Sequence, residues 1–333
     1  MASNIDSPPG LDYKQPQITA SHDLVALTFG AGHAIYFSGS RDRGKTFSDP
    51  VKIADEGFTS IGRHRGPRVA IAGDAIVISA VYGTKPNGGD GDLLAWRSTD
   101  GGRTWSSPVR VNDRAASARE GLQNIASDGK GFLYAVWLDD RSGGKALYGA
   151  SSADSGATWS VNTEIYAPTE RTICECCHPS VAIGADGTIY AMFRNWMNGS
   201  RDMYLAISRD RGKTFAPAQK LGDGTWPLKG CPMDGGGLFA STTGVETVWR
   251  RNDTIYTGRP GAPEVAIGKG KDAAIAGDVI LWSAPDGLRM QRGAGPSQIV
   301  DTDGAYPSLA MENGRTIAAW ESKGRIVVKD KLP

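Results

Sequence analysis

The chain has 333 residues, and its 37 lysine and arginine side chains nearly balance 36 aspartates and glutamates, for a formal net charge of +1. This balance argues against a nucleic-acid-binding protein held by phosphate charge. Hydrophobic residues make up 40% of the chain and charged residues 22%, which excludes general disorder and predicts a large folded core. No run approaches the roughly 18 apolar residues that would span a bilayer.

Short apolar strands, most of them opened by proline, recur along the chain. Their predicted starts are Pro16, Pro67, Gln123, Pro179, Pro232, Asp272 and Pro307. Each is followed by a second strand that ends in an aromatic residue, as in YAVWLDD (134–140) and YAMFRNW (190–196). We interpret them as the first two strands of four-stranded blades, with the first strand lining a central channel. The aromatic residues at the strand ends, among them Trp137, Trp249, Trp282 and Trp320, are expected to pack in the core.

Glycine is abundant, at 44 residues, and it contributes to a second repeat. Four segments share the pattern Ser-x-Asp-x-Gly-x-Thr-aromatic: SRDRGKTF (40–47), STDGGRTW (98–105), SADSGATW (152–159) and SRDRGKTF (208–215). The aspartate accepts backbone hydrogen bonds inside a turn, the glycine supplies a conformation closed to other residues, and the aromatic ring packs on the sheet below. Four copies indicate a hairpin turn repeated in successive blades.

This repeat is the Asp-box, and its arrangement resembles the BNR/Asp-box propeller superfamily that includes the sialidases. The likeness covers nearly the whole chain and implies that the boxes are structural turns on the blade rim. Sialidases have six blades, so the resemblance implies six. The seven strand starts favour seven blades over six, because the stretch from Pro232 to Tyr306 is too long for one blade. We therefore predict an all-β, single propeller domain over residues 1–333.

The C-terminal blade shows only three strands, ending in RIVVKD (325–330). The segment before Pro16 is expected to supply the fourth strand and to close the ring.

All four cysteines fall in loops that lead into first strands, where a propeller gathers its ligands. Cys174, Cys176 and Cys177 lie in TICECCHP (172–179), and Cys231 lies in the corresponding loop of the next blade. Adjacent blades place these two loops side by side. Such clustering indicates a site, and three interpretations compete for it.

The first interpretation is disulfides, with one bridge between the two loops that would still leave two thiols. The second is a metal centre of Cys174, Cys176, Cys177 and Cys231 with His178 near, suited to copper first and zinc second.

The third interpretation is a catalytic or resolving thiol pair that includes Cys177 and needs a low-pKa cysteine beside a base, for which His178 or Arg171 could serve.

We favour the copper-thiolate centre, with metal binding and copper-dependent oxidative catalysis as the predicted function. The alternative is a sialidase-like exo-glycosidase or glycan-binding propeller with the cysteines in disulfides. A scaffold without chemistry is a third possibility.

The alternative rests on the resemblance. Arg65-Gly66-Pro67 is similar to the family's Arg-x-Pro element, and Tyr306 precedes the last inner strand as the family's nucleophilic tyrosine does. The resemblance thus implies Arg65 as a substrate clamp and Glu120 as the partner of Tyr306. Asp90 and Asp92 are candidates for the acid, and His64 for a substrate contact. Further arginines available for a clamp are Arg119, Arg194, Arg250 and Arg251.

The expected substrate is a small molecule, peptide or glycan at the channel mouth, with no nucleic acid and no membrane span. We expect a monomer. The opening residues MASNIDSPPG lack the basic and apolar regions of a signal peptide. We expect a secreted or periplasmic protein whose signal is not present in this chain.

Overall fold

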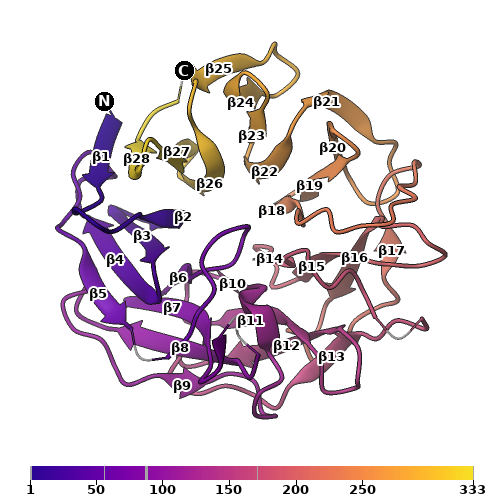
Figure 1. Cartoon of the computed structure of the whole chain (residues 1–333), viewed down its shortest axis with the longest axis horizontal. Coiled ribbons are helices and arrows are strands. Elements are labelled where there is room, and N and C mark those ends of the chain that lie inside the picture. Colours follow the sequence, from indigo (N-terminus) through magenta and orange to yellow (C-terminus); the bar gives the residue numbers. More distant parts are fainter. Residues whose placement is uncertain (1, 56, 87–88, 171, 333) are drawn as a thin grey trace.

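The computed structural model describes residues 2–55, 57–86, 89–170 and 172–332, and it is a ring of seven four-stranded antiparallel sheets (Figure 1). The predicted all-β propeller is confirmed, and so is the count of seven blades rather than six. The 3-10 turn described over its full length is η2 (Arg119–Gly121). No helix in the described ranges is long and apolar enough to cross a membrane.

Each blade has an innermost strand at the channel, two middle strands and an outer strand. The innermost strands are β2 (Lys14–Ser21), β6 (Arg68–Ala72), β10 (Gln123–Ser127), β14 (Ser180–Ile183), β18 (Gly237–Ser241), β22 (Lys271–Ala276) and β26 (Ala305–Glu312). The second strands are β3 (Leu24–Ala31), β7 (Ala75–Tyr82), β11 (Leu133–Asp139), β15 (Ile189–Arg194), β19 (Gly244–Arg251), β23 (Val279–Ala284) and β27 (Arg315–Ser322).

The third strands are β4 (Ala34–Ser40), β8 (Asp92–Ser98), β12 (Ala146–Ser152), β16 (Met203–Ser208), β20 (Thr254–Gly258), β24 (Gly287–Arg292) and β28 (Arg325–Lys329). The outer strands are β5 (Val51–Ala54), β9 (Val109–Arg110), β13 (Thr163–Tyr166), β17 (Gln219–Lys220), β21 (Val265–Lys269), β25 (Gln298–Asp301) and β1 (Ala2–Asp6).

Six of the seven predicted inner strands start within two residues of their observed positions. The strand predicted at Pro232 is wrong, because β18 begins only at Gly237. Met233 and Gly236 have the left-handed φ angles of 58° and 74°, and the ladder between β18 and β19 begins only at Gly237. Residues 231–236 therefore form a loop over the channel mouth instead of a strand.

The ring is closed by the N-terminal strand. β1 pairs antiparallel with β28, with Ile5 opposite Ile326. Both side chains are buried in one cluster with Val25 and Leu27 of the first blade. Residues from the two ends of the chain thus share a sheet and a core.

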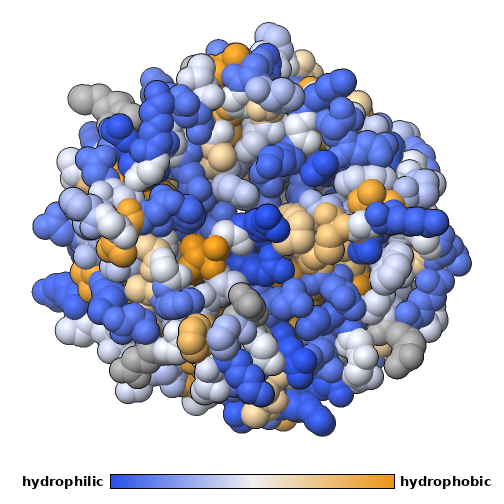
Figure 2. All heavy atoms as spheres, viewed as in Figure 1, coloured by the Kyte–Doolittle hydropathy of each residue, from blue (hydrophilic) through white to orange (hydrophobic). Residues whose placement is uncertain are grey.

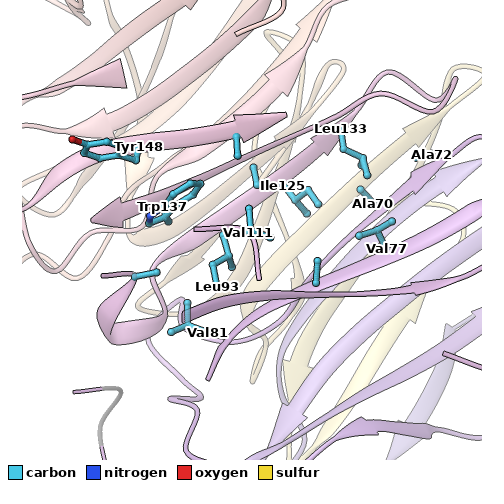
Figure 3. Close-up of a cluster of buried hydrophobic side chains, with 14 of the residues drawn as sticks. Ala70, Ala72, Val77, Val81, Leu93, Val111, Ile125, Leu133, Trp137 and Tyr148 are labelled. Atoms are coloured by element: carbon cyan, nitrogen blue, oxygen red, sulfur yellow. The ribbon is translucent and has the colours of Figure 1, made fainter. Parts of the chain in front are cut away.

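The hydrophobic core lies mainly between neighbouring blades. Figure 3 shows one such layer, in which Val77 and Leu93 of the second blade pack with Ile125, Leu133 and Trp137 of the third. Trp137, and likewise Trp282 and Trp320, are fully buried. The predicted packing role of these tryptophans is confirmed.

The four Asp-boxes form the predicted turns between third and outer strands. In the fourth box, Asp210 accepts hydrogen bonds from Thr214 N (2.9 Å) and Thr214 Oγ1 (2.6 Å), and Ser208 Oγ accepts one from Gly212 N (2.8 Å). These donors, the Thr214 hydroxyl first, lower the pKa of Asp210 to about 2. The Asp210 carboxylate thus accepts its hydrogen bonds inside its own turn, in keeping with a structural role for the box.

The glycine of the fourth box makes a close approach that can be tested. Gly212 has a φ of 83°, and a β-carbon at this position would overlap the ring of Tyr134 on the neighbouring blade. Gly129 has a similar φ of 74° but open space around it. We expect Gly212→Ala to lower the free energy of unfolding by about 1–3 kcal/mol more than Gly129→Ala, measured by urea denaturation. Equal losses in the two variants would show that the Tyr134 contact carries no packing constraint.

Candidate functional site

Three innermost strands begin with the same backbone irregularity. β2, β22 and β26 each have a register shift in their first residues. At these points Gln15, Asp272 and Tyr306 have φ angles of 56°, 55° and 51°, which residues other than glycine rarely adopt. Bulges of this kind re-aim side chains, and strained residues concentrate at functional sites.

A cavity of about 700 Å³ opens at this end of the ring. Its lining comes from the loops leading into several blades and is formed by Lys14, Gln15, Ser60, Ile61, Gly62, Arg63, Arg65, Glu120, Met233, Tyr306 and Glu321. Most of these side chains are polar or charged. In Figure 2 hydrophilic residues gather at the centre of the ring on the face shown.

Two glutamates of contrasting environment line this cavity. Glu321 is partly buried, and its Oε1 accepts hydrogen bonds from Gln15 N (2.7 Å) and Gln15 Nε2 (3.2 Å). Burial raises the pKa of Glu321, against the smaller opposing effect of these hydrogen bonds. Glu120 is more exposed, and its Oε2 accepts a hydrogen bond from Arg65 Nη2 at 3.0 Å. One carboxyl is thus biased toward its protonated form, and the other carries a cationic partner.

The sequence placed Arg65, Glu120 and Tyr306 at the mouth, and all three line the cavity. The predicted pairing of Glu120 with Tyr306 is replaced by the Glu120–Arg65 ion pair. Burial, followed by the nearby carboxylates of Asp272 and Glu321, raises the pKa of Tyr306. In the described part of the chain no carboxylate accepts a hydrogen bond from the Tyr306 hydroxyl. This environment disfavours the phenolate that a tyrosine nucleophile needs.

His64 belongs to a polar cluster beneath the cavity. Its Nε2 lies 2.7 Å from Asp272 Oδ1, and its ring stacks on His178 with centroids 4.2 Å apart. Asp234 Oδ2 accepts a hydrogen bond from Asp272 N at 3.1 Å. Tyr306 meets the His64 ring edge-on, with centroids 5.4 Å apart. The expectation that His64 lies at the channel mouth therefore agrees with its place in the structure.

His178 differs from its predicted role as a metal ligand or base. It is buried, with Nε2 3.1 Å from Gly236 O, and Nδ1 accepts a hydrogen bond from Gly235 N at 3.3 Å. Burial, with the charge of His64 next, lowers the pKa of His178 well below its usual range. Both ring nitrogens of the neutral imidazole thus bind the backbone of the 231–236 loop, and His178 acts as a structural residue. The other candidate base, Arg171, lies outside the described residues.

The other two candidates for the general acid, Asp90 and Asp92, accept hydrogen bonds within neighbouring loops. Asp90 Oδ1 accepts hydrogen bonds from Thr84 N and Lys85 N, both at 2.9 Å. The Thr84 hydroxyl and the Lys85 amide lower the pKa of Asp90, opposite to what a general acid needs. Asp92 accepts hydrogen bonds from Asn112 Nδ2 and Ala116 N, both at 2.7 Å. Neither carboxylate lines the cavity.

The candidate arginines do not form a clamp at the cavity. Arg194 is buried and donates to three backbone carbonyls, those of Asp234, Arg201 and Arg250. Arg119 pairs with Asp140, and Arg251 pairs with Glu264. Arg250 donates to the Asn252 carbonyl. The arginines that line the cavity are Arg63 and Arg65.

The cysteines form one bridge and one thiol pair. Cys176 and Cys231 are joined by a disulfide with Cα atoms 6.1 Å apart, which links the loops leading into the fourth and fifth blades. This is the single inter-loop bridge of the disulfide interpretation, and it leaves Cys174 and Cys177 as buried free thiols. The predicted four-thiolate centre needs correction, because two of its sulfurs are bonded to each other and His178 is held by the backbone. Copper, or zinc, at the remaining sulfurs stays a prediction.

The low pKa falls on a different cysteine from the one predicted as reactive. Cys174 Sγ accepts a hydrogen bond from Arg201 Nη1 at 3.0 Å and lies 3.2 Å from Cys177 Sγ. The Cys177 thiol, with the charges of Arg201 and Arg194, lowers the pKa of Cys174 to about 6 despite burial. Burial raises the pKa of Cys177 well above its usual range. Of the two free thiols, Cys174 is therefore the one whose thiolate form is favoured.

Three residues of the site went unrecognised as site residues in the sequence: Glu321, Asp234 and Asp272. Asp272 occupies in its blade the position of Tyr306 and Gln15 in theirs, but the next residue is alanine instead of proline. Alignment of the inner strands by register would have found it. Asp234 lies in the loop mistaken for a strand. Glu321 follows Trp320 on a second strand, and no local signal marks it.

The fold and the cavity define a seven-bladed Asp-box propeller with a polar, carboxylate-bearing pocket at its centre. The chain belongs to the BNR repeat-like domain family, which matches residues 33–225. No curated protein matches the sequence.

Several solved structures share the fold. The Penicillium chrysogenum α-L-arabinanase in complex with arabinobiose is 14% identical, with a TM-score of 0.59 over 99% of this chain and 97% of that chain. The GH93 α-L-arabinofuranosidase of Fusarium graminearum is 13% identical, with a TM-score of 0.58 over 98% of this chain and 97% of that chain. Trypanosoma rangeli sialidase is 13% identical, with a TM-score of 0.55 over 98% of this chain and 56% of that chain. At these identities the likeness concerns the fold alone.

The raised pKa of Glu321 predicts a change in pH dependence. A carboxyl whose pKa is higher in the folded protein than its ordinary value of 4.5 costs stability as the pH rises through the folded pKa. Glu321→Gln keeps an acceptor oxygen for Gln15 and cannot ionise. We expect its free energy of unfolding to fall less than that of the wild type as the pH rises above 4.5. Denaturant titrations over a pH series measure this.

The matched control is Glu246→Gln on β19, which removes a glutamate that pairs with Arg259 away from the cavity. It should follow the wild-type pH profile. If Glu321→Gln also followed that profile, burial of Glu321 would not govern its protonation.

Proposed function

We propose that the protein binds a carbohydrate in the cavity at the channel mouth and hydrolyses a glycosidic bond there. The observation that carries this proposal is the pair of glutamates lining one cavity, of which Glu321 is largely buried with a raised pKa and Glu120 is paired with Arg65. Glycoside hydrolases generally require one protonated and one ionised carboxyl beside the scissile bond. The volume of the cavity is in the usual range for small-ligand sites.

Glu321 is the proposed general acid. Its Oε1 is occupied by both donors of Gln15, whereas Oε2 accepts no hydrogen bond from the part of the chain that the structure describes. A proton on Oε2 would be available to a leaving-group oxygen in the cavity. The raised pKa of Glu321 keeps that proton bound at higher pH than an exposed glutamate would.

Glu120 is the proposed second carboxylate, acting as base or nucleophile. Arg65 holds it in place from the neighbouring blade at 3.0 Å. Glu120 itself has a φ of 70°, so its backbone is held in a strained left-handed conformation in the middle of η2. Positioning of this kind is typical of residues that must meet a substrate.

The charges around the cavity favour a neutral sugar over a sialic acid. Arg65 is paired with Glu120, and Lys14 is paired with Asp12 at 2.6 Å. A sialic acid carboxylate is best held by bidentate arginine contacts, and Arg63 is the one lining arginine outside the Arg65–Glu120 ion pair. The arabinose-containing ligands named for two neighbours of this fold carry no charge, and a neutral sugar of that kind is the proposed substrate class.

We propose a secreted or periplasmic location. A disulfide such as Cys176–Cys231 persists in oxidising compartments.

Activity is tested with a panel of aryl glycosides that includes α-L-arabinofuranosides, neutral hexosides and sialosides. We expect hydrolysis of a neutral glycoside, and we expect Glu321→Gln and Glu120→Gln each to lower kcat by roughly 10²- to 10⁴-fold. Tyr306→Phe should retain most of the activity, because Tyr306 is a lining residue and not the nucleophile.

Glu246→Gln serves as the control and should act like the wild type. Turnover of sialosides alone, abolished in Tyr306→Phe, would replace the glutamate pair with the tyrosine mechanism. Absence of turnover on every substrate, with no sugar binding by calorimetry, would overturn the proposal.

A further inference from the structure

The Sγ atoms of all four cysteines lie close together beside the cavity. Cys174 Sγ lies 3.2 Å from Cys177 Sγ and 3.7 Å from Cys176 Sγ, and Cys176 is bonded to Cys231. Three of these cysteines are buried, whereas Cys231 is exposed on the 231–236 loop. A thiol pair and a disulfide are therefore adjacent, and their one exposed sulfur belongs to the disulfide.

The surroundings of the two free thiols favour Cys174 as a nucleophile toward the disulfide. Arg201, itself buried, donates a hydrogen bond to Cys174 Sγ, and Cys177 Sγ lies 3.2 Å from the same atom. The Arg201 cation favours the thiolate of Cys174, which is the species that attacks disulfides. The nearest bonded sulfur to this thiolate among the described residues is that of Cys176.

We propose that the four cysteines form an internal thiol–disulfide exchange site, in which Cys174 attacks Cys176 and releases Cys231. In this step the Cys174–Cys176 bond forms, the Cys176–Cys231 bond breaks, and Cys231 leaves as a thiolate. That thiolate takes the proton of Cys177, and the Cys177 thiolate then attacks Cys174. A Cys174–Cys177 bond forms and Cys176 leaves as a thiolate.

The two steps balance without an external reagent. One disulfide and one dithiol are present at the start and at the end, and two electrons pass from the Cys174–Cys177 pair to the Cys176–Cys231 pair. The net result moves the reducing equivalents from buried sulfurs to a pair that includes the exposed Cys231, where a disulfide outside the chain can react with them.

The exchange also removes a covalent restraint on a loop that lines the cavity. Met233 packs on the buried cysteines and lines the cavity, two residues beyond Cys231. Breaking the Cys176–Cys231 bond removes the covalent link between this loop and the fourth blade. The redox state of the cysteines is thus coupled to the wall of the proposed sugar site, although the exchange itself does not depend on that site being catalytic.

The test is alkylation of the native full-length protein with a hydrophilic maleimide, followed by mass mapping. We expect Cys231 to become labelled without added reductant, with a Cys174–Cys177 disulfide in the same chains, because alkylation traps the released thiolate. In Cys174→Ser the labelling rate at Cys231 should fall by about tenfold or more, since the attacking thiolate is gone. Cys177→Ser is the matched control, because it retains the first step and should still expose Cys231.

Three other outcomes of the alkylation experiment would overturn the proposal. An unlabelled Cys231 in the native wild type, with the Cys176–Cys231 bond intact on mapping, would show that no exchange occurs. Equal labelling in wild type and Cys174→Ser would show that Cys231 is free for another reason. Protection of the thiols that ends only when a chelator is added would make the cluster a metal site. If Cys174→Ser fails to fold, as judged by its melting curve, Arg201→Lys takes its place and should also slow labelling.

Discussion

The hydrogen-bonded closure of the ring is the constraint on which the site depends. Gln15 and Glu321 are 306 residues apart in the chain, yet two hydrogen bonds join them. They meet because β1 completes the sheet of β26, β27 and β28, so that the first and last blades become neighbours. The buried environment that raises the pKa of Glu321 exists only after this closure. Ring closure therefore both stabilises the fold and creates the burial that raises the pKa of the proposed acid.

The cavity is built by irregularities at the tops of inner strands, not by the regular sheets below them. The aspartates of the Asp-boxes on the rim accept hydrogen bonds inside their own turns. At the starts of the inner strands, by contrast, the backbone adopts left-handed conformations that the local sequence does not favour, at Gln15, Asp272 and Tyr306. The surrounding blades must impose these conformations, because isolated strands would relax them. The regular part of the propeller thus stabilises the strained part, which carries the chemistry.

Local patterns explain why the architecture could be predicted from the sequence. Each Asp-box contains the serine, aspartate and threonine that form the hydrogen bonds of its own turn, and each strand start is marked by a proline or a short apolar run. Seven blades and the closing N-terminal strand follow from such signals. Where the local signal is missing the prediction was wrong, as at Pro232, because the left-handed residues of the 231–236 loop look apolar and proline-led in the sequence. The mouth residues Arg65, Glu120 and Tyr306 were found from their position before a strand. Their partners were not found, because pairing depends on how neighbouring blades are rotated.

The cysteines illustrate the same limit and connect the two halves of the site. Their clustering was evident from the sequence, but whether they bind metal or one another depends on how the two loops place the sulfur atoms in space. The structure resolves the set into a bond between two blades and a pair of thiols beside Arg201. That bond restrains the loop on which Met233 touches the cavity and Asp234 binds the backbone of Asp272. Asp272 in turn contacts His64, whose ring stacks on His178 and meets Tyr306. A continuous chain of contacts therefore runs from the sulfur atoms to the wall of the pocket, so a change in sulfur bonding has a physical route to the site where a sugar would bind.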